Sequence, residues 1–225
     1  MPLGEAPTRR IIQAEALAWM AANPAPAGTS VVTSLPDVSE LPERGFEGWQ
    51  SWFGEAARTV LRWVPEPGLV MFFQSDIRQG GAWVDKGYMV QRAAEHEGRT
   101  LLFHKLVCRH PPGTISHGRA SYSHLLCFAH RPRERLSHPG PDVLADAGYK
   151  PWSKAMGVDA CRLACRFLRE ESETTLLVDP FCGHGTVLAV ANQFGFDSLG
   201  VELSSRKVRA AKRLVLGDAS TKIAD

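Results

Sequence analysis

The sequence predicts an α/β fold with a mostly parallel sheet. Short apolar runs alternate with segments whose apolar residues recur at helical spacing, as expected when helices connect parallel strands. The most informative stretch covers residues 175–186. Its apolar run, residues 176–178, is typical of a buried parallel strand, and Asp179 stands at the carboxyl end of that strand.

A glycine turn follows this strand. Gly183 and Gly185 permit a turn tight enough for a ligand to approach the backbone. An apolar helical pattern covers 187–191, and a second strand over 198–201 ends on Glu202, about 20 residues beyond the glycines. This order of strand, glycine turn, helix, strand and acid is that of a nucleotide-binding βαβ unit, in which the second acid binds ribose hydroxyls.

The residues around the glycines indicate a particular family more specifically than this order of elements does. Asp-Pro-Phe-Cys-Gly-His-Gly-Thr, residues 179–186, resembles the first motif of class I S-adenosylmethionine-dependent methyltransferases, in the form found in amino-directed DNA methyltransferases and several RNA base methyltransferases. A dinucleotide-binding enzyme is the alternative, but it normally needs Gly-X-Gly-X-X-Gly, and Val187 and Leu188 follow here instead. The resemblance implies S-adenosyl-L-methionine as cofactor, with Asp179 near its methionine amino group and Glu202 on its ribose.

The same resemblance extends to other parts of the chain. Ala14-Glu15-Ala16-Leu17 is similar to the adenine-contacting motif of the family, although a glutamate favoured by the dipole of a following helix is the alternative interpretation. Residues 152–157 match the position of the helix start that contacts the methionine end of the cofactor. The cofactor-binding residues implied are Glu15, Lys154, Met156, Gly157, Asp179, Pro180, Phe181, Cys182, Gly183, Gly185, Thr186, Glu202 and Leu203.

A candidate catalytic turn, Ser34-Leu35-Pro36-Asp37, follows a short strand at 31–33. The resembling family has an Asp, Asn or Ser here, followed by Pro-Pro and an aromatic residue. Hydrogen bonds from the first side chain and the next carbonyl draw the protons of the target amine aside, and the ring stacks on the flipped base. Asp37 replaces the ring, so we expect it either to accept a proton or to cap the next segment, and a purely structural turn is the alternative for the tetrapeptide.

Basic and polar residues mark a candidate substrate surface. Asp76 and Arg78 lie in a polar segment, 74–81, after the strand at 69–73; they either face substrate or belong to a solvated loop. Lys105, Arg109 and Arg119 belong to the most basic patch of the chain, around a loop between strands at 100–105 and 122–129, and phosphate contact is a reasonable use for it.

Composition bounds the remaining possibilities. The 225 residues, 44% hydrophobic and 22% charged, predict one soluble domain, 1–225, with a catalytic-turn and substrate half at 1–130, a connector at 131–150 and a cofactor-binding half at 151–225. The absence of a long apolar run and of a signal-peptide pattern, with five cysteines, favours a cytoplasmic protein without membrane contact. Cysteines and histidines lack the spacing of a complete metal site, so no metal is expected.

The motifs occur in a permuted order relative to the resembling family, with the adenine acid and catalytic turn before the glycine turn. Read circularly, they predict a Rossmann-like, seven-stranded, mostly parallel sheet with helices on both faces. The function implied is methyl transfer to a nitrogen of a nucleic-acid base. No insertion is long enough for a recognition domain, which favours RNA (tRNA or rRNA) or a protein partner that supplies specificity. A DNA amino-methyltransferase without its own recognition domain, a silent cofactor-binding subunit, and a small-molecule or protein methyltransferase are the alternatives.

Overall fold

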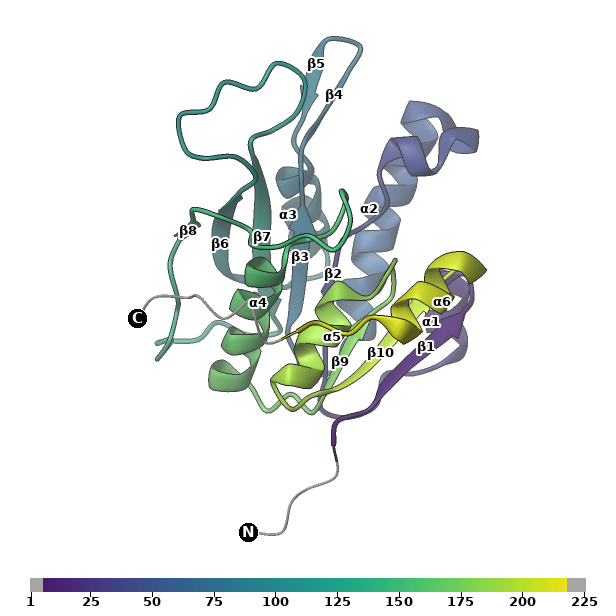
Figure 1. Ribbon diagram of the computed structural model, residues 1–225, viewed down its shortest axis with the longest axis vertical. Helices are drawn as coiled ribbons and strands as arrows, with labels where there is room; N and C mark the ends of the chain where they lie inside the picture. The colour runs from purple at the N-terminus through teal and green to yellow at the C-terminus, as the bar shows by residue number, and fades with distance from the viewer. Residues whose placement is uncertain (1–5, 218–225) are drawn as a thin grey trace.

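The computed structural model describes residues 6–217, which form one large sheet and a separate small hairpin (Figure 1). The strand order across the large sheet is β1, β10, β9, β2, β3, β7, β6, β8, and β7 alone runs antiparallel to its neighbours. The strands are β1 (Arg9–Gln13), β2 (Thr29–Thr33), β3 (Val70–Gln74), β6 (Thr100–Cys108), β7 (Tyr122–Ala129), β8 (Val143–Leu144), β9 (Leu176–Asp179) and β10 (Asp197–Glu202).

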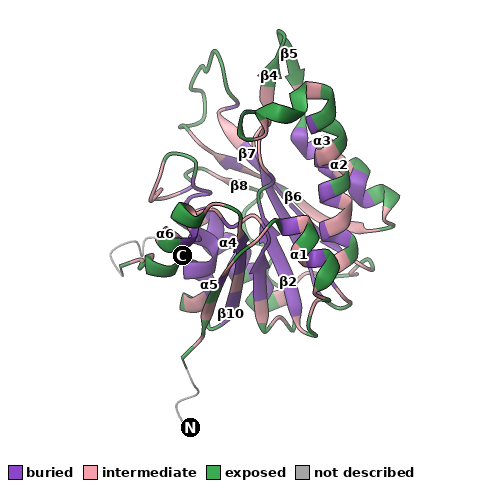
Figure 2. Cartoon of the chain, turned by 90° about the vertical axis from the view of Figure 1, so that its right-hand side faces the viewer, coloured by how far each residue is buried: buried purple, intermediate pink, exposed green. Residues whose placement is uncertain are grey.

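Three helices cover each face of this sheet, so the strands between them are largely buried (Figure 2). Apolar residues of α2 and α3 pack against one face, and those of α4, α5 and α6 against the other. The helices are α1 (Ala16–Ala22), α2 (Gly45–Trp63), α3 (Lys86–His96), α4 (Val158–Glu171), α5 (Thr186–Gln193) and α6 (Ser205–Arg213), with short 3₁₀ turns η1 (Val38–Glu40) and η2 (Pro42–Arg44).

The apolar stripe of α2 shows how the sequence produces this layering. Trp49, Phe53, Ala57 and Val60 recur at helical spacing, and all four are fully buried against the sheet. Burial of a side chain as large as Phe53 contributes about 2 kcal/mol, and truncation to alanine typically costs about 3–5 kcal/mol. The helix is therefore held by its buried face.

The parallel strands bring distant parts of the chain to one edge of the sheet. In the register of β1 with β10, Gln13 pairs with Glu202, so these two strands end together. On the other side of β9, the Oγ1 atom of Thr33 in β2 donates a 2.6 Å hydrogen bond to Asp179. Residues that follow β1, β2, β9 and β10 consequently meet at a common carboxyl edge, where open α/β sheets bind their ligands.

Three local features differ from the expectations. The seven predicted strands are present, and an eighth, β8, forms because the segment expected as a connector pairs Val143 with Leu106. The polar segment after β3 contains a β-hairpin, β4 (Ile77–Gln79) with β5 (Ala82–Val84). The helix expected to open at Trp152 begins at Val158, because Gly157 has a φ of +94°, outside the helical region. Only glycine fits there, since a Cβ atom would lie 2.3 Å from the Ala147 carbonyl oxygen.

Within residues 6–217, none of the helices combines the length and the apolar character that crossing a membrane requires.

Candidate active site

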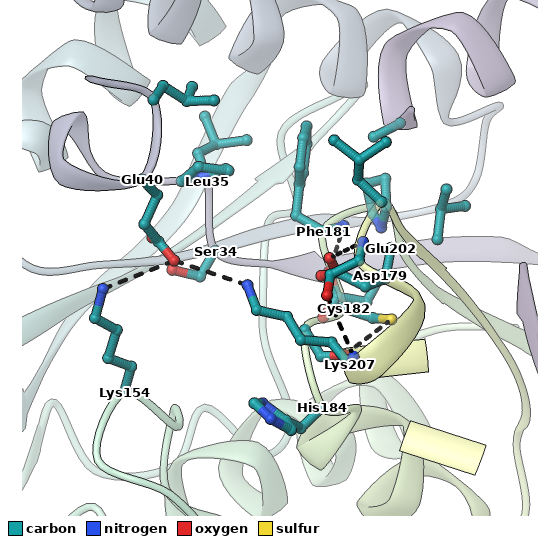
Figure 3. Close-up of a pocket in the computed structure, with 18 of the residues that line it drawn as sticks. Ser34, Leu35, Glu40, Lys154, Asp179, Phe181, Cys182, His184, Glu202 and Lys207 are labelled. Atoms are coloured by element: carbon teal, nitrogen blue, oxygen red, sulfur yellow. Dashed lines mark hydrogen bonds and ion pairs between the residues drawn. The ribbon is translucent and has the colours of Figure 1, made fainter. Parts of the chain in front are cut away.

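A cavity of about 820 Å³ opens at the carboxyl edge of the sheet (Figure 3). Its volume lies within the range typical of small-molecule sites. Most of the site residues expected from the sequence line it, although they come from opposite ends of the chain. These are Glu15, Ser34, Leu35, Pro36, Lys154, Met156, Asp179, Pro180, Phe181, Cys182, Gly183, Thr186, Glu202 and Leu203.

Asp179 is the buried charge of the cavity, only 5% exposed. Its Oδ1 atom accepts hydrogen bonds from Thr33 Oγ1 at 2.6 Å and from the backbone N–H of Phe181 at 3.1 Å. Burial, aided by the negative charge of Glu202, outweighs these bonds and raises the pKa of Asp179 to about 7. A cationic ligand group beside Asp179 would favour its ionised form, so the site is suited to bind positive charge.

Gly183 exposes backbone to the cavity. Its φ is +53°, in the left-handed region that glycine adopts without a steric penalty, and a Cβ atom built there would meet nothing within 4 Å. Thr186, at the start of α5, lines the same wall, and its buried Oγ1 atom has no hydrogen-bond partner among the described residues. Open space over a glycine turn and an unsatisfied buried hydroxyl are both features that a bound ligand would complete.

Gly185 has a different role from the one expected. Its Cβ position lies 3.1 Å from the Cβ atom of Ala211 in α6, and its φ is +79°. Gly185 therefore allows α6 to pack closely, and neither it nor Gly157 lines the cavity. This corrects the expectation that Gly157 and Gly185 contact the cofactor.

Two glutamates stand at the ends of β1 and β10. Glu15 is the N-cap of α1, where its Oε2 atom accepts a 2.7 Å hydrogen bond from the backbone N–H of Ala18. Glu202 accepts a 2.7 Å bond from the backbone N–H of Ser204. Both side chains line the cavity, so the capping interpretation and a ligand-binding role are compatible for Glu15. With Asp179, they make one wall of the cavity acidic.

Charged residues bridge the cavity, and two of them, Glu40 and Lys207, were not expected from the sequence (Figure 3). Glu40 of η1 lies 3.8 Å from Lys154 and 4.0 Å from Lys207 of α6, so three segments meet through one carboxylate. His184 and Trp152 also line the cavity, with ring centroids 4.3 Å apart. No sequence signal indicated Glu40 or Lys207, because a charged residue in a short helical segment is equally well explained as part of a solvent-exposed polar face.

The turn after β2 presents Ser34 as an exposed residue that lines the cavity. The backbone beside it is held, because Trp49 Nε1 donates a 3.1 Å hydrogen bond to the carbonyl oxygen of Pro36. Trp52, one helical turn further, lines the cavity edge-on to Phe181 at 6.0 Å between ring centroids. Trp52 is an aromatic residue that does not belong to the buried stripe of α2. That position could have indicated from the sequence that its ring is free to face a site.

Asp37 does not line the cavity. Its carboxylate accepts a hydrogen bond from the backbone N–H of Val38 in a capping box with Glu40, and it lies 3.5 Å from Nζ of the buried Lys86. This corrects the expectation that Asp37 faces the target as a proton acceptor. The structure instead supports the capping alternative, with Lys86 as an additional partner.

The predicted substrate residues separate into buried and exposed ones. Lys105 is 1% exposed, and its Nζ atom binds Gly140 O and Asp142, so the predicted phosphate contact of Lys105 is corrected to a structural role. Asp76 is likewise buried, 3.0 Å from His124 Nε2, and neither faces substrate nor forms a solvated loop. Arg78 and Arg119 are exposed, whereas Arg109 is half-buried and burial lowers its pKa.

Comparison with known proteins identifies the fold. No family model and no curated protein sequence matches the chain. TTHA0409 from Thermus thermophilus, which carries the provisional name DNA modification methylase, is similar at a TM-score of 0.67 and 22% identity, over 91% of this chain and 93% of that one. A structure of TTHA0409 complexed with S-adenosyl-L-methionine has the same TM-score.

Two further solved structures agree with this result. The PvuII DNA methyltransferase, specific for cytosine N4, has a TM-score of 0.67 at 17% identity, over 93% of this chain and 88% of that one. An M1.HpyAVI complex with S-adenosylmethionine has a TM-score of 0.59 at 12% identity, over 92% and 98%. The chain therefore has the fold of the class I S-adenosylmethionine-dependent methyltransferases.

Proposed function

We propose that the protein is an S-adenosylmethionine-dependent methyltransferase that acts on a nitrogen of a nucleic-acid base. The observation that carries this proposal is the convergence of Ser34, Asp179, Gly183 and Glu202 on one cavity from opposite ends of the chain. A cofactor-binding protein without catalysis would not require the Ser34 turn to face the same space.

The residues present fit S-adenosylmethionine. The acidic wall of Asp179, Glu15 and Glu202 suits a molecule with cationic groups and ribose hydroxyls, and the unsatisfied hydroxyl of Thr186 is available to it. Gly183 leaves room for the ligand against the backbone. Bound there, the cofactor supplies an electrophilic methyl group.

The chain contributes positioning to the reaction. The hydroxyl of Ser34 and the carbonyl of Leu35 accept hydrogen bonds from the protons of a target amine, which turns its lone pair toward the methyl donor. The Trp49 bond to Pro36 keeps this turn rigid. Trp52 supplies an aromatic face beside the turn, the role that the missing aromatic residue at position 37 leaves open.

The choice between RNA and DNA is not decided by chain size. The absence of an inserted recognition domain favoured RNA, but this chain covers 93% of TTHA0409, whose provisional name refers to DNA. The similar structures that name a substrate name DNA and lend no support to a preference for RNA, so DNA and RNA stand as equal candidate substrates. A protein partner remains part of the proposal for either substrate.

The chain order is proposed to be a circular permutation of the motif order in the resembling family. Two features support it: β1, at the start of the described chain, pairs with β10 near its end, and α6 packs beside β1. In such an arrangement the ends of the domain can be joined and reopened elsewhere at low cost.

The test is transfer of a labelled methyl group from S-adenosylmethionine to single-stranded DNA, duplex DNA and RNA, followed by digestion to nucleosides. We expect label on a base nitrogen, and we expect Ser34→Ala to slow transfer by about 100-fold without weakening cofactor binding. Ser39→Ala, a change of an exposed serine five residues away, is the matched control. Absence of label from all three nucleic acids, or equal rates for both variants, would contradict the proposal.

A further inference from the structure

The small hairpin β4–β5 projects beyond the body of the sheet, at the same end of the molecule as the loop between β6 and β7 (Figure 1). It and the start of α3 carry two large exposed rings. Trp83 is 47% exposed and Tyr88 is 59% exposed. Aromatic rings of this size normally contribute most to stability when buried, so two exposed ones on neighbouring elements indicate a binding surface.

Each ring is paired with an arginine. The guanidinium of Arg78 lies 5.9 Å from the ring centroid of Trp83, and that of Arg92 lies 5.8 Å from the ring centroid of Tyr88. We call these four residues the hairpin surface. A flat ring beside a guanidinium offers stacking and a phosphate contact within one side-chain pair, the combination that binds unpaired nucleotides.

The ring of Trp83 is held in place by the root of the hairpin. Trp83 Nε1 donates a 3.3 Å hydrogen bond to Asp76, and the backbone N–H of Lys86 donates to the same carboxylate at 2.9 Å. His124 of β7 completes the set at 3.0 Å. Burial raises the pKa of Asp76, but the interactions with His124, together with the hydrogen bonds from Lys86 and Trp83, outweigh it and lower the pKa. A buried carboxylate that stays ionised therefore ties the hairpin to the sheet.

The same contacts connect the hairpin surface to the catalytic turn. Lys86, whose backbone binds Asp76, extends its side chain to within 3.5 Å of Asp37, the residue after Pro36. Lys86 therefore connects the root of the hairpin to the turn that presents Ser34.

We propose that the hairpin surface binds a nucleic-acid strand with unpaired bases, Trp83 stacking on one base and Arg78 contacting a phosphate, and so positions the target beside Ser34. The proposal rests on the proposed function, because it assigns a surface to that substrate. It also explains how a chain of this size engages substrate through one hairpin. A duplex presents its bases stacked inside, so Trp83 would gain much less from duplex than from single strand.

The experiment measures fluorescence anisotropy of a labelled single-stranded oligonucleotide and of its duplex, as a function of salt. Wild-type protein is expected to bind the single strand more tightly. Trp83→Ala should weaken that binding by about tenfold or more, the scale of one lost base–ring stack, without changing the salt dependence. Arg78→Gln should reduce the slope of log affinity against log salt by about 0.7, the value for one lost phosphate contact.

Two controls separate binding from folding. Trp83→Phe keeps a ring but loses the bond to Asp76, so it should retain most of the affinity that Trp83→Ala loses. Arg166→Gln removes an equally exposed charge from α4, on the opposite face of the sheet, and should change neither affinity nor slope. Urea unfolding of each variant checks that the domain remains folded.

The outcomes separate this inference from the proposed function. Equal affinity of wild type and Trp83→Ala would overturn the inference, even if the wild type methylates the strand. Binding that depends on Trp83 without any methyl transfer would support the inference and overturn the proposed function. An absence of nucleic-acid binding, as expected if a protein occupies the hairpin surface, would overturn the inference as well.

Discussion

Replacement of Asp179 by asparagine should stabilise the protein at alkaline pH, although Asp179 lies in the site. The carboxyl group is buried, and its pKa is raised from 3.8 to about 7. Asparagine has nearly the same shape, and its Oδ1 atom can accept the existing bonds from Thr33 Oγ1 and Phe181 N. The substitution therefore removes the cost of burying a charge and keeps the hydrogen bonds.

The size of the effect follows from the pKa difference. Because the folded-state pKa is raised, the protonated carboxyl contributes stability that is complete below about pH 4 and is lost as pH rises through about 7. Each pH unit between these limits corresponds to about 1.4 kcal/mol. The wild type should therefore lose about 2–3 kcal/mol of unfolding free energy between pH 5 and pH 8 through this group, and Asp179→Asn should not. The stability difference in favour of the variant should grow by that amount over the same range.

Urea unfolding of both proteins at pH 5 and pH 8, without ligand, measures this difference. Thr33→Val is a useful companion, since it removes the donor to Asp179 and should destabilise the wild type more at pH 8 than at pH 5. The reasoning would be refuted if the free-energy difference between wild type and Asp179→Asn were the same at both pH values. Asp179 would then be stabilised by a partner in the folded chain, and its suitability for a cationic ligand would lose its basis.

Two further substitutions test the glycine turn and the support of the catalytic turn. Gly183→Ala should fold with a loss of about 1 kcal/mol, because its φ of +53° is unfavourable, and should weaken cofactor binding in calorimetry, whereas Gly185→Ala, 3.1 Å from Ala211, should lose more stability in urea. Comparable stability of the two variants would contradict these roles. Lys86→Met should leave the unfolding free energy within about 1 kcal/mol, because removing a buried charge offsets the lost pair with Asp37, but should slow methyl transfer. Unchanged turnover of that variant would exclude Lys86 as support for the turn.

The fold and the cavity followed from local sequence patterns. The glycine turn, the acids after parallel strands and the apolar stripe of α2 each depend on residues close together in the chain, and the topology then brings strand ends together. Asp179, Glu202 and Ser34 could be placed in one site for this reason. In the sheet, β1, β10, β9 and β2 are consecutive strands, so the residues that follow them lie side by side.

Burial of polar residues could not be predicted in the same way. Lys105 is an ordinary basic residue in sequence, but it is buried and its Nζ atom binds Gly140 and Asp142, 35 and 37 residues later in the chain. Asp76 depends similarly on His124, 48 residues away. The role of Gly185 also depends on a tertiary neighbour, Ala211, that no local pattern indicates. For Asp37 only the ion pair with Lys86 is of this kind, because its capping role is local.

Calorimetric titration of the protein with S-adenosylmethionine between pH 5.5 and 7.0 tests the central claim most directly. We expect one site per chain, with affinity that rises by about tenfold over this range as Asp179 ionises beside a cationic ligand. In Asp179→Asn, binding should be weaker at pH 7.0 and its pH dependence should disappear. Absence of binding at every pH, or wild-type affinity in Asp179→Asn, would contradict the assignment of the cavity.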